Sequence, residues 1–332
     1  MIEIRKILFG CIALLAILCQ PNSSYGQDPQ FSQFYANPIY LNPAFAGSAV
    51  CPRMTLSFRD QWPSISGTFV SYGAAYDQHF DRLSGGVGVL FLGDRAGQGT
   101  INTNAISAMY SYKLDVNRSF SMRAALQATF QQKSLNWDNL TFGDMIDERY
   151  GFVYDTQEQR PGTLTKGYVD FSAGILAYTE NFFGGVAVHH LTQPEEGFIS
   201  ISKLPRKYTA HAGYVIDIKR KSRRSRSLND INISPNILYM QQMQFHQLNY
   251  GFYYNYFPFV AGMWFRQNFE NPDAFIVLFG IQQETFKFGY TYDLTVSKLT
   301  NVTGGAHEIS FMYQFPCPEK RRRVRAINCP SF

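Results

Sequence analysis

The sequence has little charge and no long hydrophobic run. Charged residues make up 17% of the 332 positions, below the roughly 25% that is usual for a soluble domain. Intrinsic disorder requires abundant charge and few aromatics, so the 16% aromatic content excludes it as a description of the chain. The longest apolar run, residues 7–19, is shorter than a membrane-spanning helix, and no coiled-coil heptads are present. A large β-rich protein remains, either soluble or embedded in an outer membrane.

The first residues have the pattern of a secretory signal peptide. Arg5 and Lys6 precede the apolar run 7–19, and small residues occupy the −3 and −1 positions of a cleavage site before Gln27. We predict that residues 1–26 are removed and that the mature chain reaches an oxidising compartment. A single anchoring helix and lipidation of an N-terminal cysteine are the alternatives that the sequence leaves open.

Three cysteines remain in the mature chain, namely Cys51, Cys317 and Cys329. An exported protein can form one disulfide from them and keep one odd thiol. Cys317 and Cys329 are neighbours in the C-terminal tail, so they are the candidate pair. Reduced, unpaired cysteines are the alternative.

Apolar and polar residues alternate through most of the mature chain, as in a sheet whose faces meet different surroundings. In residues 285–296, for example, one face carries Phe286, Phe288, Tyr290, Tyr292, Leu294 and Val296, and the other carries Lys287, Thr291 and Asp293. Several such runs have 11 to 15 residues, whereas strands of globular proteins cluster near 5–6. A tilted membrane-spanning strand needs about 9–11 residues, and aromatics near the run ends resemble interfacial girdles. Residues 274–282 are apolar on both faces, which predicts a strand against a filled interior.

About fourteen candidate strands follow from these runs, an even number as in bacterial outer-membrane barrels. They lie near 53–61, 66–80, 84–94, 100–115, 118–133, 166–180, 182–192, 205–219, 229–241, 244–256, 259–270, 273–283, 285–297 and 306–315. With a periplasmic N-terminus, the long connections fall outside, chiefly 134–165, and tight turns fall inside, with 220–228 as the exception.

The predicted fold class is therefore all-β, a transmembrane antiparallel β-barrel of about 14 strands with a plug-like N-terminal arm and a basic periplasmic tail. The predicted parts are a signal peptide (1–26), an N-terminal arm (27–52), an outer-membrane β-barrel (53–315) and a C-terminal tail (316–332).

Positive charge gathers in two segments on the predicted periplasmic side. The candidate docking residues are Lys219, Arg220, Lys221, Arg223, Arg224 and Arg226 in one connection and Arg321, Arg322 and Arg323 in the tail. Such runs can bind lipid head groups, stay solvated, or dock an acidic periplasmic partner. Nucleic acid is not an expected partner of an exported chain.

No catalytic motif is present in the sequence. HExxH, GxSxG and Walker A patterns are absent. His189 and His190 are adjacent, so in a strand they point to opposite faces and cannot form a two-ligand clamp. We expect a non-enzymatic protein with no catalytic, cofactor-binding or metal-binding residues.

Residues 27–49 do not alternate and contain Pro29, Pro38 and Pro43, which exclude a central strand. Asn37-Pro38 and Asn42-Pro43 are turn formers. Aromatic residues surround them, so this arm must bury itself, and the inside or the periplasmic mouth of the barrel is the available surface. A loose leader that packs only on its own barrel is the alternative.

The arm resembles the start of the PorP/SprF family of type IX secretion system membrane proteins. The resemblance rests on Asp28-Pro29-Gln30-Phe31-Ser32-Gln33-Phe34 and on Asn42-Pro43-Ala44-Phe45-Ala46-Gly47. The end of the chain is also similar, with His307-Glu308-Ile309-Ser310 in the last strand and a basic tail that ends in Ala326-Ile327-Asn328-Cys329-Pro330-Ser331-Phe332. Two motifs at opposite ends, in order, extend the resemblance over the whole mature chain.

This resemblance implies an outer-membrane component that assists export or surface attachment of cargo proteins, such as adhesins of gliding bacteria. It also implies contacts with the secretion-system translocon, with periplasmic ring components and with the secreted cargo protein. Outer-membrane lipid is a further expected partner, because the predicted barrel wall faces it. A plugged diffusion channel for small apolar molecules is the alternative function. A soluble β-sandwich array is a third reading of the alternation.

Overall fold

A computed structural model of the chain describes residues 28–49, 51–97, 99–117, 119–219, 230–269, 272–296 and 304–317. The predicted signal peptide, Arg220 to Arg226 and the tail from residue 318 lie outside these ranges. The chain divides into two compact units, residues 1–30 and residues 31–332, and the barrel belongs to the second. No helix in the described ranges has the length and apolar character that crossing a membrane requires.

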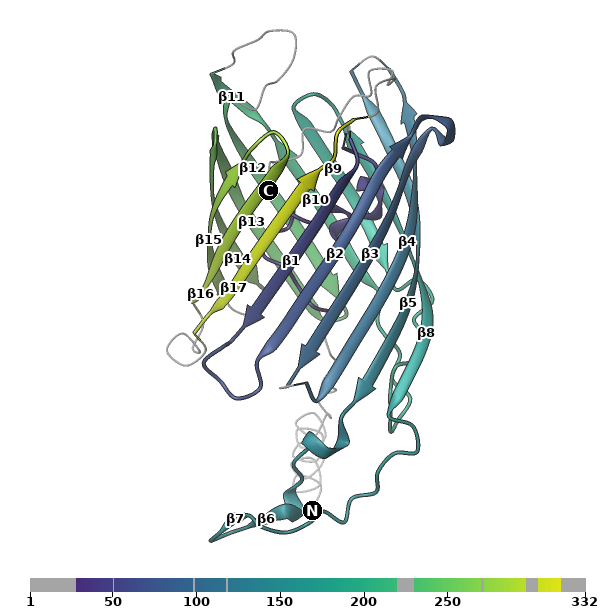
Figure 1. The fold of residues 1–332 in the computed structure, drawn as a ribbon, viewed down its shortest axis with the longest axis vertical. Coiled ribbons are helices and arrows are strands. Elements are labelled where there is room, and N and C mark those ends of the chain that lie inside the picture. The colour runs from purple at the N-terminus through teal and green to yellow at the C-terminus, as the bar shows by residue number, and fades with distance from the viewer. Residues whose placement is uncertain are drawn as a thin grey trace, which may run out of the picture. The chain divides into compact units, whose positions relative to one another are not determined.

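The described part of the second unit is dominated by one antiparallel sheet (Figure 1). Its strands are β1 (Arg53–Gln61), β2 (Phe69–Phe80), β3 (Gly85–Ala96), β4 (Ile101–Asp115), β5 (Ser121–Leu135), β8 (Thr165–Tyr178), β9 (Phe182–His189), β10 (Lys207–Tyr214), β11 (Ile216–Lys219), β12 (Ile231–Gln242), β13 (Phe245–Tyr256), β14 (Phe259–Asn268), β15 (Pro272–Gln282), β16 (Phe286–Thr295) and β17 (Ala306–Gln314).

The sheet closes into a barrel. Each strand pairs with its neighbour in sequence, β1 pairs with β17, and β10 and β11 both pair with β12 as two parts of one wall strand. Across the described ranges the wall thus has fourteen strands, as predicted. In the described ranges, closure pairs the wall strands on both sides except β11, which pairs with β12 alone. A membrane requires such pairing because lipid offers no hydrogen-bond partners.

Alternation along each strand sorts side chains to the two faces of the wall. In β5, Arg123 and Gln127 are buried on the inner face, whereas Leu126 and Phe130 are 70% and 50% exposed on the outer face. This order is the reverse of a soluble barrel, whose apolar side chains would fill the interior. The polar set therefore faces the lumen and the apolar set faces lipid.

The observed strands begin and end within about three residues of the predicted ones, and β1 has the predicted bounds. The main difference lies in the predicted strand 205–219, which is interrupted at Val215. The Val215 N–H donates to the Asn181 carbonyl at 2.8 Å, outside the ladder, and the register with β12 shifts between Asp217 and Lys219. A bulge of this kind bends a strand locally.

The two ends of the barrel differ in their connections. At one end, the loop end, residues 136–164 join β5 to β8 and contain the hairpin of β6 (Ile146–Asp147) and β7 (Gly151–Phe152). The other end is the turn end (Figure 1). There η2 (Asp81–Leu83) joins β2 to β3, and the last strand, β17, ends. The predicted division into long and short connections therefore describes the barrel well.

The structure corrects the predicted disulfide. Cys317 bonds to Cys51, with their Cα atoms 4.9 Å apart, so the pairing of Cys317 with Cys329 is wrong. Cys51 precedes β1 and Cys317 follows β17, and the register of these paired strands brings the two residues together. The wrong choice followed from closeness in sequence, whereas closeness across the β1–β17 seam decides the pairing.

Candidate functional site in the barrel lumen

The arm, residues 31–48, forms two short helices inside the barrel wall. These are α2 (Pro38–Leu41) and η1 (Pro43–Phe45), each with a proline in its first turn, where the missing N–H costs nothing. The Asn42 side chain caps η1 by accepting a hydrogen bond from Ala44 N–H at 2.9 Å. The turn-forming Asn-Pro pairs of the sequence thus start helices within a folded arm.

Nearly every arm residue is buried against the inner face of the wall. Phe34 contacts Trp264 of β14, with ring centroids 5.1 Å apart, and Tyr35 packs edge-on against Phe183 of β9 at 5.5 Å. Phe45 stacks on His211 of β10 at 5.3 Å. The inward residues of β15 that were predicted to meet a filled interior, Ala274, Ile276 and Leu278, belong to the same buried cluster.

The start of the arm meets a buried ionic cluster. This cluster consists of Arg59 (β1), Arg266 (β14), Asp293 (β16) and Glu308 (β17), all nearly inaccessible to solvent. The Ser32 hydroxyl donates to Asp293 at 2.6 Å and accepts from Arg59 and Arg266, each at 2.6 Å. Two cations and two anions balance formally, as buried charges require.

Glu308 of the ionic cluster also holds the arm backbone. Its carboxylate accepts from Ser32 N–H at 2.6 Å and from Gln33 N–H at 3.0 Å, and it contacts Arg59 at 3.3 Å. The Gln33 side chain donates to the Glu308 carbonyl at 3.1 Å and accepts from the Ser310 hydroxyl. Ser32 and Gln33 therefore attach the arm to the wall by charge-assisted hydrogen bonds, which are the strong kind.

Asn42 attaches the middle of the arm. Its amide nitrogen lies within 3.1 Å of the Ile175 carbonyl in β8 and 3.2 Å of the Val186 carbonyl in β9. Gly185 makes this approach possible, because a Cβ there would lie 2.9 Å from the Asn42 amide nitrogen. A side chain with two amide hydrogens suits this position, since it satisfies two wall carbonyls at once.

The end of the arm is fixed at the turn end. Gly47 has a left-handed φ of +63°, and a Cβ there would lie 2.9 Å from the Gln78 carbonyl, so glycine is needed on both counts. Its N–H donates to Asp77 at 2.8 Å, and Asp77 pairs with Arg53 at 2.5 Å. Arg123 donates to the carbonyls of Ala46 and Gly47 at 2.9 and 2.8 Å.

The structure thus brings together most of the motif residues named from the sequence. Two of the motif residues, Asp28 and Pro29, precede the arm and are half-buried. The buried arm holds the others, namely Phe31, Ser32, Gln33, Asn42, Pro43, Ala44, Phe45 and Gly47. Of the candidate docking residues, Lys219 is exposed at the end of β11, and the remaining ones, like Cys329, fall outside the described ranges. The partners of the arm on the wall were not predicted as site residues, although alternation places Arg123, Asp293 and Glu308 on the polar face.

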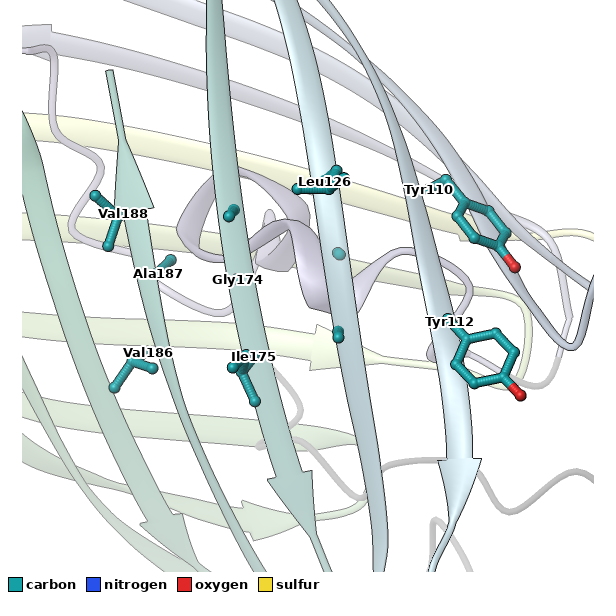
Figure 2. A pocket seen from close by; sticks show the side chains of 11 residues that line it. Tyr110, Tyr112, Leu126, Gly174, Ile175, Val186, Ala187 and Val188 are labelled. Atoms are coloured by element: carbon teal, nitrogen blue, oxygen red, sulfur yellow. The ribbon is translucent and has the colours of Figure 1, made fainter. Parts of the chain in front are cut away.

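Apart from the arm and its contacts, the wall has an apolar groove on its lipid-facing side (Figure 2). The groove crosses β4, β5, β8 and β9 and has a volume of about 460 Å³. Tyr110 and Tyr112 border it on one side and Val186 and Val188 on the other, while small residues such as Ala173 leave the space open. Its lining is apolar and offers no acid or base.

Comparison with known proteins yields one family and a set of distant barrels. Residues 23–313 match the family model described as type IX secretion system membrane protein PorP/SprF. No curated protein matches the chain. The CymD monoaromatic hydrocarbon channel is similar at 12% identity, with a TM-score of 0.47, and the match covers 87% of this chain and 95% of that one. The Pseudomonas putida toluene transporter TodX is similar at 8% identity and 0.46, covering 84% and 92%.

Proposed function

The chain belongs to the PorP/SprF family of type IX secretion system membrane proteins, and we propose that it serves as a non-enzymatic outer-membrane component that assists export or surface attachment of cargo proteins. The family match over residues 23–313 carries this proposal, because it spans the arm and the described barrel wall up to the last residue but one of β17. The barrel, with its apolar outer face, supports a place in the outer membrane.

The burial of the arm against the inner face of the wall supports handling of cargo at the surface of the barrel. The arm is attached to the wall at its start by Ser32, in its middle by Asn42 and at its end by Gly47. A polypeptide cargo that crossed the lumen would have to displace all three attachments. We therefore assign cargo and translocon contacts to residues 136–164 at the loop end, and take the loop end as the outer side.

The basic segments supply the second set of contacts in this proposal. Lys219 at the end of β11 and Cys317 after β17 lie at the turn end, which would face the periplasm, and residues 220–226 and 320–325 follow them in the sequence. Basic runs there suit acidic surfaces of periplasmic ring components and anionic lipid head groups. Recovery of ring components with a chain that lacks residues 318–332, and so keeps the Cys51–Cys317 bond, tests the tail part of this assignment, and unchanged recovery would remove that part.

Deletion of the gene and complementation test the secretion role. In the deletion strain, we expect large surface adhesins to be lost from the cell surface, and the intact gene to restore them. A matched control is a strain complemented with the Ile199→Ala variant, because Ile199 is an exposed loop residue outside the arm and outside residues 136–164. Normal adhesin display in the deletion strain would contradict the proposal.

A plugged diffusion channel for small apolar molecules is the second candidate function. Trp264, Tyr253 and Phe183 give the lumen an aromatic lining where Phe34 and Tyr35 of the arm now pack. A channel would open when the arm is removed, so deletion of residues 28–49 would raise conductance in planar bilayers and increase uptake of apolar solutes. Conductance that stays at the background level after this deletion argues against a channel.

A further inference from the structure

The long connection at the loop end is a folded substructure. Asp147 of β6 accepts hydrogen bonds from the N–H groups of Arg149 and Tyr150 at 2.8 and 2.9 Å and from the Tyr154 hydroxyl at 2.9 Å. Asp144 accepts from Gln157 N–H at 2.7 Å. These two carboxylates fix the β6–β7 hairpin and the segment after it, so the hairpin can present a preformed surface.

Large apolar side chains are exposed on this hairpin. Tyr150, Phe152 and Tyr154 are 71%, 61% and 55% exposed, and Ile146 and Val153 are also exposed. The hairpin projects beyond the loop end, away from the wall strands (Figure 1). It therefore lies outside the apolar band of the wall. Contact with lipid tails explains exposed apolar residues within that band but does not explain those of the hairpin. Exposed aromatic clusters with a polar rim are typical of protein interfaces.

The connection that carries the exposed cluster is acidic overall, although the Arg149 guanidinium lies over the Tyr150 ring at 5.7 Å. Residues 136–164 contain six acidic and two basic residues, a formal net charge of −4. Tyr and Phe supply the large buried contacts of interfaces, and a surrounding negative field selects a positive partner and speeds its association.

We propose that the β6–β7 hairpin is a docking site for a protein partner whose contact surface is basic and holds an apolar recess for Tyr150 and Phe152. The proposal deepens the proposed function, since such a partner would be cargo or translocon. An anionic lipid surface is disfavoured by the negative charge of the hairpin. A second copy of the chain is disfavoured because its basic segment begins at Lys219, which lies at the opposite end of the barrel.

Photo-crosslinking in cells identifies the occupant. A benzophenone amino acid replaces Tyr150 in the full chain, and the same amino acid at Ile199, which is 81% exposed in the neighbouring connection, is the matched control. We expect an adduct at position 150 with a different protein, whose crosslinked domain carries net positive charge, and none at 199. An adduct only with lipopolysaccharide, only with a second copy, or only with an acidic protein, or no adduct, overturns the proposal.

Binding of the purified crosslinked partner then tests the chemistry. The triple variant Glu148→Gln, Asp155→Asn, Glu158→Gln lowers the net charge of residues 136–164 from −4 to −1 and leaves Asp144 and Asp147 in place. We expect affinity at low salt to fall at least tenfold for this variant, and affinity at every salt concentration to fall at least tenfold for Phe152→Ala. Ile199→Ala should bind like wild type.

These results separate the two proposals. Unchanged affinity in the triple variant and in Phe152→Ala overturns the docking site, even if the deletion strain loses its adhesins. Normal adhesin display in the deletion strain overturns the secretion role, even if the hairpin binds a basic protein. Heat-modifiable migration of each variant on gels verifies that the barrel is folded.

Discussion

Removing the Glu308 carboxylate should release the start of the arm. In Glu308→Ala, the N–H groups of Ser32 and Gln33 lose their acceptor, and Arg59 and Arg266 are left with Asp293 as the one anion of the cluster. Breaking a buried ion pair by deleting one partner costs about 3–5 kcal/mol. This cost applies to the closed arm, where the unpaired charge is dry. In the open arm, water solvates that charge and relieves most of the cost. The free energy needed to open the arm should therefore fall by a similar amount.

Thiol labelling measures that opening. Ala36→Cys places a thiol on a residue that is 5% exposed in the closed arm, and Cys329→Ser removes the third cysteine of the predicted mature chain. A fall of 3 kcal/mol or more in the free energy of opening raises the rate of maleimide labelling by about a hundredfold or more. Labelling is followed on purified protein in detergent, with heat-modifiable migration as the test of an intact barrel.

Asp273→Asn is the matched control for the loss of an anion. Asp273 also contacts Arg266, at 3.7 Å, but its side chain is 35% exposed. Half-exposed pairs contribute at most about 1 kcal/mol, so labelling should rise less than about fivefold. Equal labelling rates in Glu308→Ala and in the parent chain would refute the idea that the ionic cluster holds the arm.

Three further predictions follow from the contacts described. Asn42→Asp should lower the unfolding temperature of the barrel by more than Asn42→Ala. A carboxylate facing the Ile175 and Val186 carbonyls donates no hydrogen bond and adds repulsion. Unfolding temperatures from gel migration give the order of the two variants, and the reverse order would contradict this reasoning. Cys51→Ser should expose Cys317 to labelling and lower stability by about 2–5 kcal/mol, whereas Cys329→Ser should change neither. The hydrogen bonds from Arg149, Tyr150 and Tyr154 lower the pKa of Asp147. Its stabilisation of the hairpin is therefore present above the ordinary carboxyl pKa and is lost only as pH falls through the lowered value. Proteolysis of residues 136–164 should stay slow at pH 4 and accelerate in more acidic buffer, and an onset above pH 5 would contradict this.

The wall was predictable from the sequence because membrane strands are long and have unlike faces. Leu126 and Phe130 alternate with Arg123 and Gln127, and a one-residue slip would put all of them on the wrong face. Period-two alternation therefore predicts both where a strand lies and which of its faces points to the lumen. The interruption at Val215 was not predictable, because it depends on a hydrogen bond to Asn181, which belongs to another turn.

The contacts of the arm needed the structure. Its prolines and aromatics predict a buried, non-strand segment, but Ser32 and its partner Asp293 are separated by 261 residues. Alternation put Asp293 and Glu308 on the lumen side without indicating which lumen residues meet. Cys51 was passed over for the same reason, since its proximity to Cys317 arises only when the last strand returns to the first.

The Cys51–Cys317 bond also has a mechanical consequence. It joins residues 266 positions apart, so every wall strand lies within one covalent ring. The chain before Cys51 and the chain after Cys317 are two tails that leave this ring at the same point. Tension applied to the C-terminal tail therefore reaches covalent bonds before it reaches the hydrogen bonds between β1 and β17. A single cut in residues 136–164 likewise leaves both fragments linked until the disulfide is reduced.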